Sequence, residues 1–348
     1  MKITTRDIAA RCGVSASTVH KILRYPEAAF RPQTRKRVLR AAVQMGYRPN
    51  QAALSVRTGR FDAVVLLQDT SRRSLESAEF AHTLCEAFEE RDVHLILARF
   101  AEERLAGDGR TPKVFRQVMA DGLILDYHCD VPAAVVAALD RLKLPWILIN
   151  NRRRHDCVYP DEGRAGREAT EALLQRGHRR VAYLDYSFCP KDAAVCHFSR
   201  LDRLAGYRAA MKAARLPARL LTAGARPRGD EVERLHAFMR SFLQAPDRPT
   251  GIVVYSGAEE LVWVAASEQR LRIPQDLSLV VLDRPTRVGR WNLAHVPVPW
   301  ERIAREAAAM LGRKIEDPAK PQPAVVVQAR MVEGETLAPP PSGMRART

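Results

Sequence analysis

Short apolar runs alternate with amphipathic stretches over most of the chain. The runs are dominated by valine, isoleucine and leucine, and they lie at 63–67, 94–98, 122–126, 146–150, 181–185, 251–255 and 277–283. The clearest amphipathic stretches between them lie at 77–91, 132–142, 163–176, 201–214 and 258–269. Buried strands separated by helices are typical of parallel sheets that are covered on both faces. Two such sets predict an α/β fold with two doubly wound lobes.

Residues 1–60 differ, because their pattern is helical throughout. Thr4 and Asp7 are spaced as a capping box that opens a first helix, and Gly13 supplies a tight turn after it. Ser15 can then cap a second helix by accepting a hydrogen bond from a backbone amide three residues further on. A helix, a glycine turn and a second helix form the layout that places side chains in the major groove of DNA.

The second helix has one apolar and one polar face. The apolar face comprises Val19, Ile22 and Leu23, and the polar face comprises Ala16, Ser17, His20 and Lys21. A third helix is expected to begin with Pro32 and to end before Gly46. Four cations lie on its outward side, where they can approach phosphates: Arg35, Lys36, Arg37 and Arg40.

The distribution of charge sets the same segment apart. The formal net charge of the chain is +16. Residues 1–60 hold 13 lysines and arginines against two acidic residues, whereas the other 288 residues hold 43 against 38. Such a concentration favours a polyphosphate partner over an ordinary solvated basic face, because each neutralised phosphate releases counterions.

Other classes of function find little support. The six cysteines show no CxxC pair or Cys/His metal spacing, so reduced thiols are expected and no metal or cofactor is predicted. No GxGxxG, GxxxxGK[ST], GxSxG or HExxH motif is present, so no catalytic residue is predicted. No apolar run approaches the roughly 18 residues of a membrane span, and the N-terminus lacks a signal-peptide pattern. These features predict a cytoplasmic protein without a membrane partner.

Residues 4–60 resemble the DNA-binding headpiece of the lac repressor (LacI/GalR) family of bacterial regulators. The matching stretches are DIAARCGVSASTVHKIL, TRKRVLRAAVQMGYRPN and AALSVRTGR. The combination of GVSxxTV, the GYxPN turn and the RTGR exit is specific, although each would be weak alone. The resemblance implies an all-α helix-turn-helix headpiece at 1–49, followed by a hinge helix and linker at 50–60.

The resemblance also implies which residues contact DNA. Ala16, Ser17 and His20 would face base edges, with Thr18 and Lys21 near bases or the backbone. Family members usually carry Ser-Arg where this chain has His20-Lys21. Lysine lacks the bidentate fork of arginine, so a different half-site is expected. The full predicted set comprises Thr5, Ser15, Ala16, Ser17, Thr18, His20, Lys21, Arg35, Asn50, Ala53, Leu54, Val56 and Arg57.

The hinge departs from the family pattern at its wedge. In the family, the hinge helix folds on specific DNA and inserts a leucine into the minor groove. The wedge position is Val56 here, with Leu54 nearby. A shorter wedge should unstack a base step less effectively, so either a milder bend or the use of Leu54 is expected. The sequence does not choose between them.

Residues 61–333 resemble the bilobed, periplasmic-binding-protein-like core of the same family in the order of their elements. The resemblance implies one lobe built from about 61–162 plus 294–325 and a second from about 163–293. It also implies that the core dimerises and binds an effector in the cleft between its lobes. Residues 334–348 are expected to be disordered.

The predicted effector contacts are polar residues at strand ends: Asp69, Ser71, Asn150, Asp161, Arg203, Ser256 and Asp283. Arg203 matches an arginine that usually clamps hydroxyls or carboxylates, and Asp283 matches a carboxylate that accepts sugar hydroxyls. Elsewhere the family pattern is lost. The stretch TSRRSL replaces Asn-Pro-Phe-Phe, Ser256-Gly257 replaces Asn-Asp, and Val298 replaces a glutamine. A simple hexose therefore does not follow, and each such residue could instead only cap a helix.

Together these features predict a ligand-responsive transcriptional regulator, favoured as a repressor. It would bind a palindromic operator in double-stranded DNA as a homodimer and sense a sugar or sugar derivative. Two alternatives stay open: an enzyme with a DNA-binding appendage, and an architectural protein that binds DNA without regard to sequence. The identity of the effector, and whether it releases or promotes DNA binding, cannot be deduced from the sequence.

Overall fold

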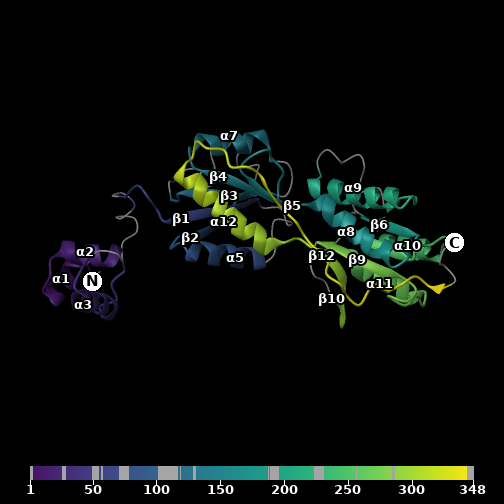
Figure 1. Ribbon diagram of the computed structural model, residues 1–348, viewed down its shortest axis with the longest axis horizontal. Coiled ribbons are helices and arrows are strands. Elements are labelled where there is room, and N and C mark those ends of the chain that lie inside the picture. Colours follow the sequence, from purple (N-terminus) through teal and green to yellow (C-terminus); the bar gives the residue numbers. More distant parts are fainter. Residues whose placement is uncertain are drawn as a thin grey trace. The chain divides into compact units, whose positions relative to one another are not determined.

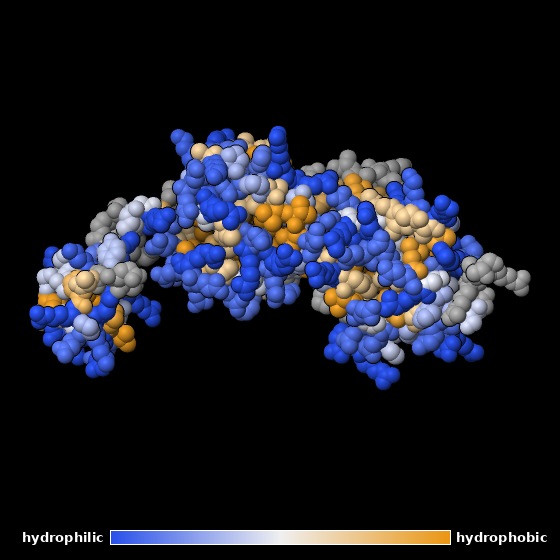
Figure 2. Space-filling view, viewed as in Figure 1, coloured by the Kyte–Doolittle hydropathy of each residue, from blue (hydrophilic) through white to orange (hydrophobic). Residues whose placement is uncertain are grey.

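The computed structural model of the chain describes two compact units, Met1–Phe61 and Asp62–Thr348. The described residues are 3–25, 29–48, 55, 58–69, 78–100, 117, 119–127, 131–186, 188, 196–222, 231–255, 257–283 and 287–342, without the side chains of residues 69, 231, 232 and 235. Within these residues no helix is long and apolar enough to cross a bilayer. Figure 2 shows hydrophilic residues over most of the visible surface, with apolar residues in smaller areas.

In the described part of the first unit, three short helices pack as a bundle (Figure 1): α1 (Thr5–Cys12), α2 (Ala16–Arg24) and α3 (Pro32–Gln44). Apolar side chains from all three helices close its core: Ile8, Ala9, Cys12, Val19, Ile22, Val38, Ala41 and Ala42. The predicted three-helix pattern is confirmed, including the start of the third helix at a proline. Burial of a few small and branched side chains thus holds the unit together.

The second unit contains two parallel sheets, and the first has the order β13-β5-β4-β3-β1-β2. Its strands are β1 (Ala63–Asp69), β2 (His94–Phe100), β3 (Gly122–Asp126), β4 (Trp146–Ile149), β5 (Cys157–Pro160) and β13 (Val325–Val327). Helices α5 (Ala78–Glu89) and α12 (Trp300–Glu316) bury one face, and α7 (Ala133–Arg141) contributes to the core on the other.

The second sheet has the order β12-β9-β8-β6-β7, and its strands are also parallel. Its strands are β6 (Val181–Leu184), β7 (Arg219–Leu221), β8 (Gly251–Tyr255), β9 (Ser278–Asp283) and β12 (Ala294–Pro297). Helices α8 (Glu162–Gln175) and α9 (Phe198–Ala213) cover one face, while α10 (Glu231–Gln244) and α11 (Glu259–Glu268) cover the other. A small hairpin, β10 (Arg287–Val288) and β11 (Trp291–Asn292), precedes β12.

The prediction of two parallel sheets with helices on both faces is confirmed, but two assignments were wrong. Residues 294–297, assigned to the first lobe, form β12 and pair with β9 in the second sheet. Residues 334–342, expected to be disordered, pack on the second sheet. There Thr336 is fully buried and its hydroxyl donates to the carbonyl of Leu279 at 2.8 Å. The Thr336 hydroxyl, bonds from Ser278 and His178 to Ala338, and backbone pairing hold this proline-rich segment, and its composition alone does not reveal these contacts.

Candidate nucleic-acid interface and small-molecule site

The capping predicted for the first two helices is present. The Thr4 side chain accepts a hydrogen bond from the amide of Asp7, and the Asp7 carboxylate accepts from the Thr4 hydroxyl at 2.7 Å and amide at 2.8 Å. These bonds hold the pKa of Asp7 below its ordinary value. Gly13 ends α1 in the left-handed region, with φ 60°, which only glycine adopts readily. Ser15 then accepts from the amide of Thr18 at 3.0 Å and opens α2.

These caps fix which side chains α2 presents to solvent. Val19 and Ile22 are buried in the bundle, whereas Ser17 and Lys21 are exposed. The other predicted contacts on this helix are half-buried: Ala16, Thr18 and His20. Thr5, at the start of α1, is also half-buried. The outer face therefore offers small, hydroxyl and cationic groups, which suit the edges of bases and nearby phosphates.

The outward cations of α3 fall into two kinds. Lys36, Arg37 and Arg40 are exposed, and nearby phosphates could reach them. Arg35 is half-buried, and its Nη2 donates to the carbonyl of Tyr25 at 2.7 Å, which ties α3 to the end of α2. Arg35 therefore has a structural role, and its contact with phosphate stays a prediction.

Five predicted DNA contacts in the hinge lie outside the described residues, together with two predicted effector contacts. The hinge residues are Asn50, Ala53, Leu54, Val56 and Arg57, and the effector contacts are Ser71 and Ser256. The choice between Leu54 and Val56 as the minor-groove wedge is therefore not tested. Asp69 ends β1, but its side chain also lies outside the described part.

In the second lobe, Arg203 lies in a buried ion pair. Its Nε and Nη2 donate to the two carboxylate oxygens of Glu162 at 2.5 and 2.7 Å, and both side chains are at most 3% exposed. Close packing of α8 and α9 creates this contact. A Cβ on Gly166 would lie 2.0 Å from the carbonyl oxygen of Arg203, and one on Gly206 would lie 2.0 Å from that of Gly163. Glycine at both positions lets the two helices approach.

A second buried pair lies beside the first. Arg200 Nη2 donates to the Asp185 carboxylate at 2.9 Å, with both side chains at most 6% exposed. The guanidinium groups of Arg200 and Arg203 lie 5.0 and 5.2 Å from the ring centroid of Tyr255, at the end of β8. Burial raises the pKa of Tyr255, so its hydroxyl remains protonated. Two stacked cations and their carboxylates thus form one polar cluster inside the lobe.

Buried side-chain atoms without a hydrogen-bond partner among the described residues include Arg203 Nη1, in this cluster, and Tyr183 Oη, next to it. Tyr183 is fully buried, and burial raises its pKa well above the ordinary value. For Arg203, burial opposes the charge, but the carboxylates of Glu162 and Asp283 outweigh it and hold its pKa well above the ordinary value. Unsatisfied donors beside a strand end are what a polar ligand or a bound water would complete.

Asp283 borders the same cluster from the end of β9. Its backbone has φ 110°, a conformation rare for a residue with a side chain. Its carbonyl accepts a hydrogen bond from the amide of Val298, which joins the end of β9 to the segment that leads into α12. Its carboxylate contributes to the field around Arg203.

The two lobes contact each other between the segment after β4 and the start of α9. Asn150, just after β4, is buried with φ 51°, and its carbonyl accepts from His197 Nε2 at 2.7 Å. Arg152 forms an ion pair with Asp202 at 2.8 Å. His197 and Asp202 belong to the first half of α9 and the residue before it. The helix that carries Arg200 and Arg203 is thus linked directly to the first lobe.

The predicted effector residues therefore have different surroundings. Arg203 and Asp283 share one cluster, whereas Asn150 contributes its carbonyl to a contact between lobes. Asp161 caps α8 by accepting from the amide of Arg164 at 3.0 Å. Four members of the cluster were missed: Glu162, Asp185, Arg200 and Tyr255. Asp185 and Tyr255 each end a predicted apolar run, which was a usable signal, but the pairing of Glu162 with Arg203 depends on contacts between helices.

Comparison with known proteins gives matches for both units. Residues 4–50 match the family described as bacterial regulatory proteins, lacI family, and residues 170–337 match the periplasmic binding protein-like domain. The HTH-type transcriptional regulator CelR of Thermobifida fusca is 28% identical over 333 residues, which is 90% of this chain and 92% of CelR. The HTH-type transcriptional repressor PurR of Escherichia coli O139:H28 is 26% identical over 354 residues, covering 97% of this chain and 98% of PurR.

Solved structures show the same fold along nearly the whole chain. A complex of the regulator CelR with cellobiose has a TM-score of 0.62 at 24% identity and covers 96% of this chain and all of that one. A lac repressor dimer bound to operator and an anti-inducer has a TM-score of 0.70 at 17% identity, covering 97% of this chain and all of that one. At these identities the likeness establishes the fold, and the chemistry of each site must be argued from this chain's own residues.

Proposed function

Because the chain belongs to the lacI family of bacterial regulatory proteins, we propose that it is a DNA-binding transcriptional regulator that acts in the cytoplasm as a ligand-responsive repressor. It binds a palindromic operator as a homodimer, with one headpiece on each half-site. The observation that carries the proposal is the capped helix α2, which presents Ser17 and Lys21 to solvent from a small cationic module.

Helices α3 and α2 of the headpiece make different contributions to DNA binding. Phosphate contacts from the exposed cations of α3 supply affinity that depends on salt but not on sequence. The outward face of α2 supplies discrimination, because only base edges distinguish one site from another. Lys21 provides a single point charge there, so we expect less strict recognition of guanine than a bidentate arginine would give.

The effector is a polyhydroxylated molecule, of the sugar or sugar-derivative class, that binds beside the Arg200–Arg203 cluster. Arg203 Nη1 and Tyr183 Oη provide unsatisfied donors there, and the Asp283 carboxylate can accept from hydroxyls. Each arginine already has its own carboxylate, so a neutral ligand with several hydroxyls suits the cluster better than an isolated anion would. The cellobiose complex of CelR supports this class of ligand.

We expect the effector to act on the contacts between the two lobes. Arg200 and Arg203 lie on α9, whose amino-terminal end contacts the first lobe through His197 and Arg152. A ligand that binds one arrangement of the lobes more tightly shifts the population toward it. This arrangement then sets the spacing of the two hinge segments in the dimer and hence the affinity for the operator.

Two experiments test these proposals in turn. A duplex selected from a random library should be bound much more tightly than a scrambled duplex of the same length and composition, by about 10³-fold or more at physiological salt. Equal affinity for both duplexes would favour the architectural alternative. A thermal-shift screen of mono- and disaccharides, sugar acids and nucleosides should identify a compound that raises the melting temperature in a concentration-dependent way. A response to none of the sugars would contradict the proposed effector class but not DNA binding.

A further inference from the structure

A pocket of about 640 Å³ lies on the first lobe, apart from the cluster proposed to bind the effector. It is lined by the end of α7, the start of β4, the loop between β4 and β5, and the end of α12. Trp146 is the first residue of β4, so the pocket lies at the amino edge of the first sheet. Asn150 and the contacts between lobes lie at its carboxyl edge. A ligand here would not compete with the proposed effector.

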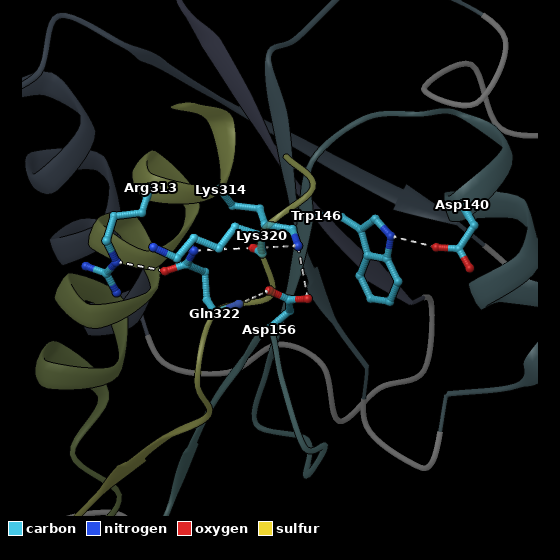
Figure 3. A network of polar contacts seen from close by, with 7 residues as sticks. All are labelled: Asp140, Trp146, Asp156, Arg313, Lys314, Lys320 and Gln322. Carbon is cyan, nitrogen blue, oxygen red and sulfur yellow. Dashed lines mark hydrogen bonds and ion pairs between the residues drawn. The ribbon is translucent and has the colours of Figure 1, made fainter. Parts of the chain in front are cut away.

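The polar groups at one end of the pocket form a rigid frame (Figure 3). Asp156 accepts from Lys314 Nζ at 3.1 Å and from the amide of Gln322 at 2.9 Å. Arg313 Nε donates to the Gln322 side chain at 3.1 Å, and Lys314 Nζ also donates to the carbonyl of Lys320 at 3.3 Å. The charges of Lys314 and Asp156 therefore neutralise each other within the wall, so they contribute shape and little net charge.

The remaining charge of the pocket is positive. Its lining includes Lys143, Arg153 and Arg154 in addition to the Lys314–Asp156 pair, and one further carboxylate, Asp140. Asp140 accepts from the indole Nε1 of Trp146 at 3.2 Å. The lining thus contains three exposed cations and one carboxylate that is already hydrogen-bonded. Such an excess of donors converging on a concave surface suits an anion with several oxygens, and arginine in particular matches phosphate.

Another part of the lining contains an aromatic ring and apolar side chains. The indole of Trp146 is held in place by Asp140, and the guanidinium of Arg153 lies 5.4 Å from its ring centroid. The Arg153 carbonyl and amide are bonded to the Sγ of Cys157, which fixes the loop that carries the arginine. Val136, Leu144 and Pro145 continue the apolar surface. Aromatic rings and guanidinium planes are the groups on which a planar base stacks.

From this juxtaposition we propose that the pocket binds a mononucleotide, with its phosphate at Lys143 and Arg154 and its base against Trp146 and Arg153. The volume falls within the range of about 300–1,000 Å³ that small-molecule sites occupy. The proposal goes beyond the function proposed above, because it adds a second ligand of different chemistry on a different edge of the sheet. It stands whether or not the Arg200–Arg203 cluster binds a sugar.

Titration calorimetry of the full-length protein with adenosine 5′-monophosphate and uridine 5′-monophosphate tests the proposal. At least one of the two should bind, and adenosine, uridine and inorganic phosphate should each bind about tenfold or more weakly, because each lacks half of the recognised groups. Arg154→Ala and Lys143→Ala should each weaken the mononucleotide about tenfold. The matched control is Arg302→Ala, which removes an equal charge from the exposed face of α12 and should leave binding unchanged.

Trp146→Phe provides an independent readout. Binding of the mononucleotide to the wild-type protein should change the tryptophan fluorescence, and this change should be lost in Trp146→Phe. Thermal melting of each variant checks that it is folded, which is expected since Lys143, Arg154 and Arg302 are all exposed.

Three results would overturn the proposal: no binding of either mononucleotide, equal weakening by Arg302→Ala and Arg154→Ala, or binding of inorganic phosphate as tight as that of the nucleotide. A fourth is weaker operator binding by Lys143→Ala and Arg154→Ala in a protein that binds no mononucleotide. The cations would then serve the phosphates of DNA.

Discussion

The cations of the headpiece and those of the second lobe occupy opposite environments. In the headpiece, Lys21, Lys36 and Arg40 are exposed. The only described acidic side chain there, Asp7, already accepts two hydrogen bonds from Thr4. In the second lobe, Arg200 and Arg203 are buried, and each lies against its own carboxylate. The same kind of charge therefore serves two different purposes.

Solvation accounts for the difference. An exposed cation keeps its water, and when it neutralises a phosphate it releases counterions that were condensed on the DNA. A group of such cations therefore gives affinity without specificity. A buried cation has lost its hydrating water. It is tolerated only because a carboxylate and hydrogen bonds take the place of that water. Such a group is rigid, and it can discriminate between ligands by geometry. On the proposed function, salt-dependent attraction of phosphate thus comes from the exposed cations of the headpiece, whereas geometric recognition of the effector comes from the buried cluster of the lobe.

The largest expected effect comes from removing the carboxylate of the Arg203 pair. Glu162→Gln leaves a buried guanidinium without its counterion, which should lower the free energy of unfolding by about 3–5 kcal/mol. Urea denaturation measures the change. The double variant Glu162→Gln with Arg203→Met should recover much of the loss, because it removes the uncompensated charge. A loss below about 1 kcal/mol would mean that the pair behaves like an exposed one.

A second substitution tests whether the close approach of α8 and α9 positions the Glu162–Arg203 pair. Gly206→Ala would place a Cβ 2.0 Å from the carbonyl oxygen of Gly163, so α8 and α9 must separate. We expect a loss of about 1–3 kcal/mol. Gly312→Ala is the matched control in α12, because its Cβ meets no atom within 4 Å. It should stabilise the protein by about 0.5–1 kcal/mol. Equal losses in both variants would contradict the role of the close helix approach.

Substitutions in the headpiece test whether α2 and α3 have separate roles in DNA binding. Lys21→Ala should cost about 1–3 kcal/mol on the selected operator and should relax the preference at one half-site position. Lys36→Ala should weaken all duplexes alike and reduce the slope of log affinity against log salt by about 1. Lys36 is preferable to Arg35 for this test, since Arg35 also holds the end of α2. Anisotropy titrations at several salt concentrations distinguish the two patterns, and identical patterns would contradict the division of roles on α2 and α3.

The smallest expected effect is the dependence of stability on pH that comes from the buried side chain of His178. His178 is bonded to the Thr250 hydroxyl at 2.9 Å and the Ala338 carbonyl at 2.8 Å, and burial lowers its pKa. The unfolded chain therefore takes up a proton more readily than the folded one. Stability should be fully present above about pH 6.5 and should fall as the pH falls below it.

His178→Gln should show a shallower loss of melting temperature between neutral and mildly acidic pH than the wild type. If His178→Gln follows the wild-type curve, His178 does not contribute to the pH dependence.

Local signals in the sequence were sufficient for the headpiece. The pairing of Thr4 with Asp7, the turn at Gly13 and the cap at Ser15 each depend on residues within a few positions, so the spacing alone predicts them. The short, uninterrupted apolar runs of the two sheets were equally clear, because strands buried on both faces need continuous apolar side chains.

Signals over longer distances were not sufficient. The pairs Glu162–Arg203 and Asp185–Arg200 form only because α8 and α9 pack closely, and no spacing rule relates their positions. The short strand β12 and the segment around Thr336 depend on partners more than ten residues away in the sequence. Their local sequences contain proline or polar residues and favour no strand. The prediction of lobe membership failed at 294–297 for this reason.

Regulation requires that a ligand bound in the core changes the affinity of the headpiece for its operator. Fluorescence anisotropy on the selected palindromic duplex, with and without the sugar identified by thermal shift, measures this change. The ligand should change the dissociation constant of the full-length protein about 5- to 150-fold, the range of typical coupling free energies. Saturating ligand that raises the melting temperature but leaves the dissociation constant unchanged would contradict the claim.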